Sequence, residues 1–268
     1  MDLSGGRQST NVEDRRGRRL GPGIIGGGLG TIAIVVIGLL LGVDPSVILD
    51  QGGGASAPAV DTTSPADDDT KTFVSTIVGF TEDTWSEIFR AGGETYRAPT
   101  LVLFTGAVES ACGLGQAAMG PFYCPEDQKV YLDLSFFQEL RDRFQAPGDF
   151  AQAYVIAHEV GHHVQNLLNL SSGDRSNRAS VQTELQADCL AGVWAVRTQR
   201  TREAQSLSFI QTGDVEEALN AASMIGDDKL QQESQGRVRP ETFTHGSAAQ
   251  RVSAFKRGFQ SGEIAGCR

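Results

Sequence analysis

Two histidines and a glutamate stand in a pattern that can bind and use a metal ion. Residues 157–165 read AHEVGHHVQ, so His158 and His162 are four residues apart. On a helix, both imidazoles would project from one face and could bind one tetrahedral Zn²⁺. Glu159 would lie beside this pair, where its carboxylate could take a proton from a zinc-bound water. His163 would point off the ligand face, so we expect it to pack or to form a hydrogen bond.

The residues around this motif decide between a metal site and a chance occurrence of a short pattern. A plain surface helix could contain the same five letters, but it would have polar neighbours. A buried helix cannot hide two imidazoles and a carboxylate unless something satisfies them. The setting favours the metal site because the neighbours are apolar, namely Tyr154, Val155, Ile156, Ala157, Val160 and Val164.

A catalytic zinc needs a third protein ligand and one open position. The metzincin pattern would require Gly at 165 and His at 168, but the chain has Gln165 and Leu168. Residues 182–190, QTELQADCL, offer Glu184 and Asp188 four residues apart. Glu184 could complete a gluzincin-like His₂Glu site, and Asp188 could accept the other N–H of a ligand imidazole. The alternative of a solvated acidic pair is disfavoured by the apolar neighbours Leu185, Ala187, Leu190 and Trp194.

Two residues near the C-terminus are further candidates for the site. His245 precedes the last predicted helix and could stabilise a tetrahedral oxyanion, although a surface histidine in a turn is the alternative. Arg251, one turn into that helix, could face either the oxyanion or a carboxylate of the site.

The candidate ligands must be held by two helices, which the apolar spacing and end signals predict at 150–169 and 178–198. A strand is predicted at 129–134, and its alternation suggests a half-exposed edge that could take an extended peptide as one more strand. Over 71–268 we therefore predict an α+β fold, a mainly helical zincin-like domain with a small sheet. The other predicted elements are a strand after Pro99 and helices at 72–91, from 135, from 214 to 226, and from 247 to 262.

The segment before this domain looks like a membrane anchor. Residues 24–43 are twenty uncharged residues, enough for roughly 30 Å of helix, so they predict one transmembrane helix. The alternative is a cleaved signal peptide, because residues 52–59 could mimic its cleavage site. Arginines precede the span and no Lys or Arg follows it before Lys71, which predicts a single-pass protein of the cell membrane. Residues 1–20 would then be a basic cytoplasmic segment, 44–70 a flexible linker, and 71–268 an extracytoplasmic domain.

The net charge limits the possible binding partners, and the cysteine content limits the possible disulfides. The 268 residues carry a net charge of −10, which argues against nucleic acid as a partner. Four cysteines allow three disulfide connectivities. Cys112 and Cys124 bracket a Gly-rich loop, while Cys267 could pin the C-terminal tail to the helix of Cys189. We therefore predict these two pairs.

Long stretches of the chain resemble the neutral zinc metallopeptidase family of bacteria. The stretches that carry the resemblance are 111–140, 157–165, 184–194 and 243–262, and residues 11–17 are similar to the family's N-terminal segment. The resemblance covers nearly the whole chain apart from the linker. It implies a single-span protein with an extracytoplasmic zincin domain, but it supplies no substrate.

For the site, the resemblance implies His158, His162 and Glu184 as zinc ligands and Glu159 as the catalytic residue. The Thr-His-Gly-Ser stretch with Arg251 is also similar to a motif of membrane zinc peptidases that process prenylated proteins, which favours a catalytic His245. The sequence thus predicts a peptidase with one Zn²⁺ per chain that acts on peptide or protein substrates. The alternatives are an inactive zincin-fold binding module and a latent enzyme that a partner or protease releases.

Overall fold

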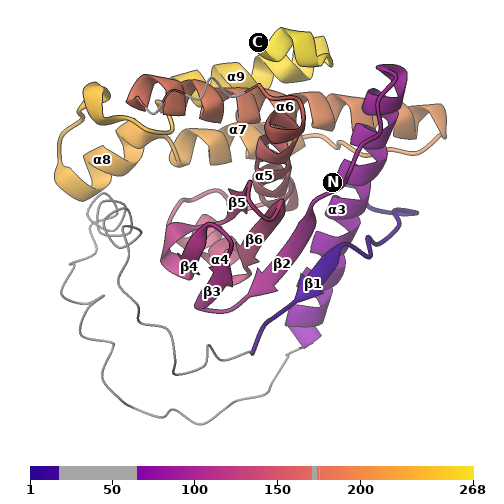
Figure 1. Ribbon diagram of the computed structural model, residues 1–268, viewed down its shortest axis with the longest axis horizontal. Helices are drawn as coiled ribbons and strands as arrows, with labels where there is room; N and C mark the ends of the chain where they lie inside the picture. Colours follow the sequence, from indigo (N-terminus) through magenta and orange to yellow (C-terminus); the bar gives the residue numbers. More distant parts are fainter. Residues whose placement is uncertain (18–64, 171–173, 175) are drawn as a thin grey trace.

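The computed structural model describes residues 1–17, 65–170, 174 and 176–268. These residues form a mainly helical α+β fold with small sheets, as the sequence predicted (Figure 1). The helices are α3 (Pro65–Ala91), α4 (Ser135–Asp142), α5 (Asp149–Leu167), α6 (Asn177–Ala204), α7 (Asp214–Met224), α8 (Asp227–Gln235) and α9 (Ala248–Ser261). The strands are β1 (Val12–Asp14), β2 (Thr100–Phe104), β3 (Ala107–Ser110), β4 (Gly113–Gln116), β5 (Phe122–Cys124) and β6 (Lys129–Asp133).

The larger sheet has the strand order β1-β2-β6-β5, and β3 and β4 form a separate antiparallel pair. Strand β6 is parallel to β2 on one side and antiparallel to β5 on the other. The prediction that 129–134 is an edge strand is therefore wrong. Its alternation was misleading because Tyr131 and Asp133 are buried with partners: the Tyr131 hydroxyl donates to Asp127, and Asp133 accepts the backbone N–H of Gly106.

Helix α5 lies between the sheet and a layer formed by α6, α7 and α9 (Figure 1). Its buried side chains contact both sides, and aromatic rings such as Phe150, Trp194 and Phe209 pack together in the core. Small residues let α6 and α9 approach closely. A Cβ on Gly258 of α9 would come within 1.8 Å of the carbonyl oxygen of Cys189 on α6. This close crossing brings the side chains of α9 next to the candidate ligand helix α6.

The predicted membrane topology is wrong. Among residues 1–17, 65–170, 174 and 176–268, no helix has the length and apolar character needed to cross a membrane, and the predicted span 24–43 lies outside those residues. Strand β1 pairs in parallel with β2, so the segment before 24–43 and the domain after it share one sheet. A single crossing at 24–43 would place them on opposite sides of a membrane, which this pairing contradicts. The predicted cytoplasmic N-terminus with an extracytoplasmic domain is therefore not supported.

Residues 1–17 pack along the domain through several further contacts. The Met1 ammonium group donates to Asp149 at 2.9 Å and to Asp214 at 3.3 Å, at the first residues of α5 and α7. The Arg7 guanidinium forms ion pairs with Glu82 and Asp83 on α3. These contacts anchor the segment to α3 and to the first residues of α5 and α7. The predicted linker ended at residue 70, but residues 65–70 belong to α3; its other part, 44–64, lies outside the described residues.

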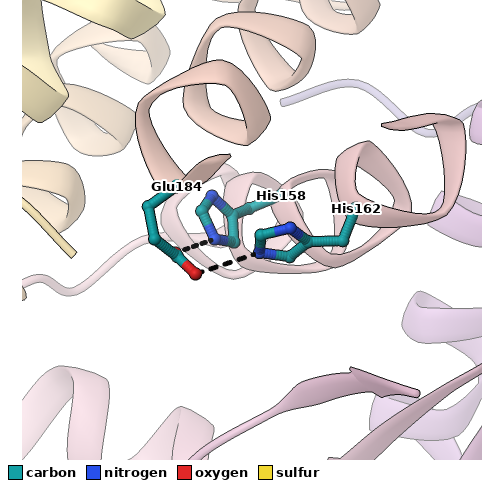
Figure 2. A group of neighbouring side chains, drawn as sticks. All are labelled: His158, His162 and Glu184. Atoms are coloured by element: carbon teal, nitrogen blue, oxygen red, sulfur yellow. Dashed lines mark hydrogen bonds and ion pairs between the residues drawn. The ribbon is translucent and has the colours of Figure 1, made fainter. Parts of the chain in front are cut away.

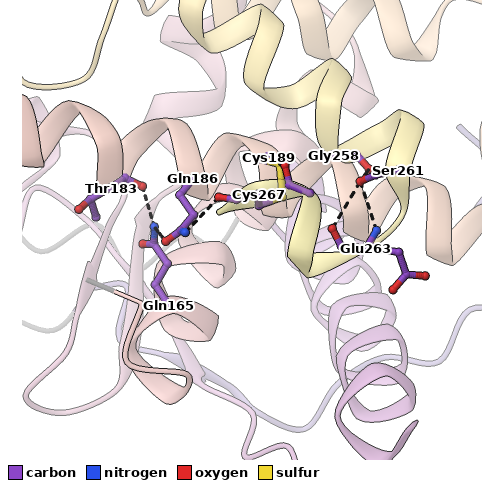
Figure 3. Close-up of a disulfide and its surroundings, with 9 residues drawn as sticks. Gln165, Thr183, Gln186, Cys189, Gly258, Ser261, Glu263 and Cys267 are labelled. Carbon is purple, nitrogen blue, oxygen red and sulfur yellow. Dashed lines mark hydrogen bonds between the residues drawn. A yellow bond between two sulfur atoms is a disulfide. The ribbon is translucent and has the colours of Figure 1, made fainter. Parts of the chain in front are cut away.

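Two disulfides join Cys112 to Cys124 and Cys189 to Cys267, the pairs that the sequence predicted. The first closes the loop that contains β4 and leads into β5. Figure 3 shows the second, which ties the C-terminal turn to α6; the backbone oxygen of Cys267 also accepts a hydrogen bond from Gln186.

Replacing each cysteine pair by alanines should destabilise the protein unequally. Loop-closure entropy predicts a loss of about 3 kcal/mol for the pair separated by 12 residues and about 4.5 kcal/mol for the pair separated by 78. Urea unfolding of both double variants beside the wild type measures this difference. Equal losses, or a larger loss for Cys112 and Cys124, would show that local packing rather than loop length sets the stabilisation.

Candidate metal centre

The packing of α5 against α6 brings the two halves of the site together. Gly161 lies inside the HEVGH motif on α5, and a Cβ there would come within 2.9 Å of the carbonyl oxygen of Ala187 on α6. Glycine therefore allows the two helices to approach closely at this point. The contact places Glu184, one turn before Ala187, opposite the two histidines of α5.

His158, His162 and Glu184 form a compact group of donor atoms that could hold a metal ion (Figure 2). The Nε2 atom of His158 is 3.1 Å from one carboxylate oxygen of Glu184, and the Nε2 atom of His162 is 3.5 Å from the other. Ligands about 2.0–2.1 Å from a tetrahedral zinc lie roughly 3.3–3.4 Å apart, so this spacing fits zinc. Two imidazole nitrogens and one carboxylate are also the donor types of a His₂Glu zinc site.

The second nitrogen of each imidazole has a partner that fixes the ring. His158 Nδ1 is 2.8 Å from Asp188, the contact that the spacing of Glu184 and Asp188 predicted. His162 Nδ1 is 2.8 Å from the side-chain oxygen of Gln165, whose amide nitrogen donates in turn to the carbonyl oxygen of Thr183. An acceptor at each Nδ1 favours a proton there, which leaves both Nε2 lone pairs available for a metal.

Asp188 is the centre of a buried polar network behind His158. Its carboxylate is fully buried and accepts from Arg251 at 2.8 and 2.9 Å and from the hydroxyl of Tyr154. Arg251 is also buried, and its guanidinium pairs with this carboxylate at the edge of the cleft. Burial raises the pKa of Asp188, but Arg251 and His158 outweigh this and lower that pKa to about 2. Asp188 therefore stays ionised as an acceptor for the ligand ring.

Protons compete with a metal ion for the nitrogen atoms of both candidate ligand imidazoles. Burial lowers the pKa of His158, but Asp188 and Glu184 outweigh it and raise that pKa to about 10. Burial likewise lowers the pKa of His162, but Glu184 outweighs burial and raises that pKa above its usual value. Because a histidine binds a metal only in its neutral form, metal binding must displace these protons.

A cleft of about 550 Å³ opens over this group, which is within the size range of ligand sites. Glu159 lines the cleft beside both histidines, and no residue of the described ranges forms a hydrogen bond to its carboxylate. Residues of β5 and of the loop before it also line the cleft. Apolar side chains dominate the remaining lining, including Met119, Pro121, Phe122, Phe136, Phe144, Val155, Ile225 and Leu230.

The remaining two histidines lie in different surroundings. His245 lines the cleft, and its side chain is half exposed. His163 is fully buried, between the hydroxyl of Tyr123 and the carbonyl oxygen of Arg97, so it packs as the sequence predicted. Among the sequence candidates, the structure thus gathers His158, Glu159, His162, Glu184, Asp188, His245 and Arg251 around one cleft.

Comparison with known proteins assigns the chain to a family. The family described as "Putative neutral zinc metallopeptidase" matches residues 1–268. The chain belongs to this family. It is similar to the uncharacterized protein YpfJ of Escherichia coli K12, with 46% identity over all of this chain and 98% of that protein. It is also 40% identical to the uncharacterized protein Rv2575 of Mycobacterium tuberculosis H37Rv, over 84% of this chain and 82% of that protein. No solved structure matches.

Family membership and the His/Glu group both support a candidate metal site. The structure also adds residues that sequence reasoning missed. Gln165 lies three residues after His162, so helical spacing could have identified it as the partner of that ring. Tyr154 lies one turn before His158 and could have been found in the same way. Asp227, which contacts His245, belongs to a helix that the sequence pattern did not predict.

Proposed function

We propose that this protein is a zinc-dependent peptidase that hydrolyses peptide bonds in the cleft above α5. His158, His162 and Glu184 would hold one Zn²⁺ per chain. The observation that carries this proposal is the spacing of their donor atoms, with both Nε2 atoms 3.1–3.5 Å from the Glu184 carboxylate. When bound, zinc would polarise the substrate carbonyl and lower the pKa of a water molecule.

In this proposal, Glu159 accepts the proton of the attacking water and later gives it to the leaving amine. Its position supports the role, because its carboxylate faces the cleft beside both candidate ligands and has no hydrogen-bond partner among the described residues. His245 would donate to the developing oxyanion from the same cleft. Asp188, with Arg251 behind it, would hold the His158 ring in its ligating orientation.

The substrate would bind extended along β5. Among the strands of the described residues, β5 pairs only with β6, so its other edge can hydrogen-bond the backbone of a peptide. Phe122 and Tyr123 of β5 line the cleft, which places that edge next to the candidate metal ligands. Because apolar side chains line most of the cleft, the peptide would carry apolar residues next to the scissile bond.

The test of this proposal is the effect of Glu184→Ala on zinc content and hydrolysis. Removing one of three ligands should lower zinc occupancy at least about tenfold at limiting zinc, since zinc sites of this kind need all three protein ligands. Metal analysis and cleavage of an unstructured protein such as casein give the two readouts. Glu139→Ala is the matched control, because Glu139 lines the same cleft on α4 away from the ligand group.

Two results would speak against the proposal. Full zinc in Glu184→Ala would mean that another residue is the third ligand. Stoichiometric zinc in the wild type without cleavage of any peptide would instead favour a binding module that keeps the fold and lacks catalysis.

A further inference from the structure

The loop that carries His245 is held by a single carboxylate on α8. One oxygen of Asp227 accepts the backbone N–H groups of Thr244 at 2.7 Å, His245 at 2.7 Å and Gly246 at 2.9 Å. The backbone N–H of Asp227 donates back to the carbonyl oxygen of Gly246. These four hydrogen bonds fix the position of the loop relative to α8.

The other oxygen of Asp227 faces the His245 ring. It lies 3.3 Å from Nδ1, and the hydroxyl oxygen of Thr244 lies 3.0 Å from the same nitrogen. With Nδ1 turned toward these acceptors, the opposite edge of the ring carries Nε2. The side chain is half exposed and lines the cleft, so Nε2 is the nitrogen left for a substrate.

The charges around the ring favour its protonated form. Burial and Arg251 lower the pKa of His245, but Asp227 and Glu184 outweigh them and raise it. The same contact, together with the backbone donors, lowers the pKa of Asp227 although burial raises it. A doubly protonated imidazole can donate from Nδ1 to Asp227 and from Nε2 into the cleft at once.

We propose that Asp227 is a positioning residue, which holds His245 with Nδ1–H toward its own carboxylate and Nε2–H toward the scissile carbonyl. The inference rests on the proposed peptidase function, because His245 acts there on the oxyanion. It assigns a role to Asp227, a residue of α8 that lies outside the HEVGH motif. Asp227 acts through His245 and does not itself touch the substrate.

Asp227→Asn is the informative variant because it keeps a side-chain oxygen for the three backbone N–H groups and removes the negative charge. Loss of an orienting partner typically costs about 10–100-fold, so we expect kcat to fall by that factor while zinc content stays unchanged. Asp228→Asn is the matched control: Asp228 is the next residue and caps the same region by accepting from Ala248 at 2.7 Å. Its kcat should stay within about twofold of the wild type. A kcat for Asp227→Asn within the same range would overturn the proposal.

A double variant separates positioning of His245 from a general structural role. In a His245→Ala background, Asp227→Asn should change kcat by less than about twofold, because the group through which it acts is gone. If the two losses multiply instead, Asp227 acts by another route and the proposal is wrong.

The ring itself can be observed without any hydrolysis. In the full-length zinc-loaded protein with ¹⁵N-labelled histidine, Asp227→Asn should lower the pKa of His245 by about one unit or more, and Asp228→Asn should leave it unchanged. An unchanged pKa in Asp227→Asn would overturn the contact between the two residues. A wild type that cleaves no peptide would contradict the peptidase function instead, so the two failures are distinguishable.

Discussion

Glu159→Gln should abolish most hydrolysis while zinc stays bound at the wild-type level. The amide keeps the size of the side chain but cannot accept the proton of the attacking water. General-base catalysis typically contributes about 10²–10⁴-fold, so kcat should fall by that factor. Parallel measurements of zinc content and kcat on one purified sample check both parts of the expectation.

Glu139→Gln is the control for this variant because it removes a second carboxylate from the same cleft. Its kcat should remain within about threefold of the wild type, since the proposed mechanism gives Glu139 no role. Retention of activity in Glu159→Gln would show that another group takes the proton. Loss of zinc in that variant would show that Glu159 supports the metal rather than the chemistry.

Arg251→Met should destabilise the fold by about 3–5 kcal/mol, the usual cost of leaving a buried charge without its partner. Arg251 donates twice to Asp188, and both side chains are buried. Methionine would fill much of the volume but leave the Asp188 carboxylate uncompensated beside His158. Chemical unfolding at neutral pH measures the loss.

Arg257→Met on the same helix is the matched control, because Arg257 is exposed and its loss should change stability by less than about 0.5 kcal/mol. Adding Asp188→Asn to Arg251→Met should recover part of the lost stability, since it removes the uncompensated charge. Equal stability of Arg251→Met and Arg257→Met would mean that the buried ion pair contributes nothing to the fold.

The candidate ligand set could be predicted largely from local spacing. His158 and His162 lie one turn apart on one predicted helix, and Glu184 and Asp188 lie one turn apart on the next. The two disulfide pairs were also predicted, because one closes a short loop and the other joins the chain end to the ligand helix. Such features depend on residues close in sequence or on few possible pairings.

Features that depend on distant residues could not be predicted in this way. The three-residue strand β1 is too short to show a periodicity, and its pairing with β2 places the N-terminal segment in the same sheet as the domain. The central place of β6 depends on β5, whose three residues are too few to show an alternation. Asp227 contacts a residue 18 positions away, across a helix start that the sequence pattern did not reveal.

The central claim is that peptide hydrolysis depends on one zinc ion held by His158, His162 and Glu184. Titrating zinc into the metal-free wild type tests this claim most directly. A chelator should remove both zinc and hydrolysis. The hydrolysis rate should then rise in proportion to the zinc added and level off at about one zinc per chain. Full hydrolysis in the chelated protein, or stoichiometric zinc binding without recovery of any cleavage, would contradict the account.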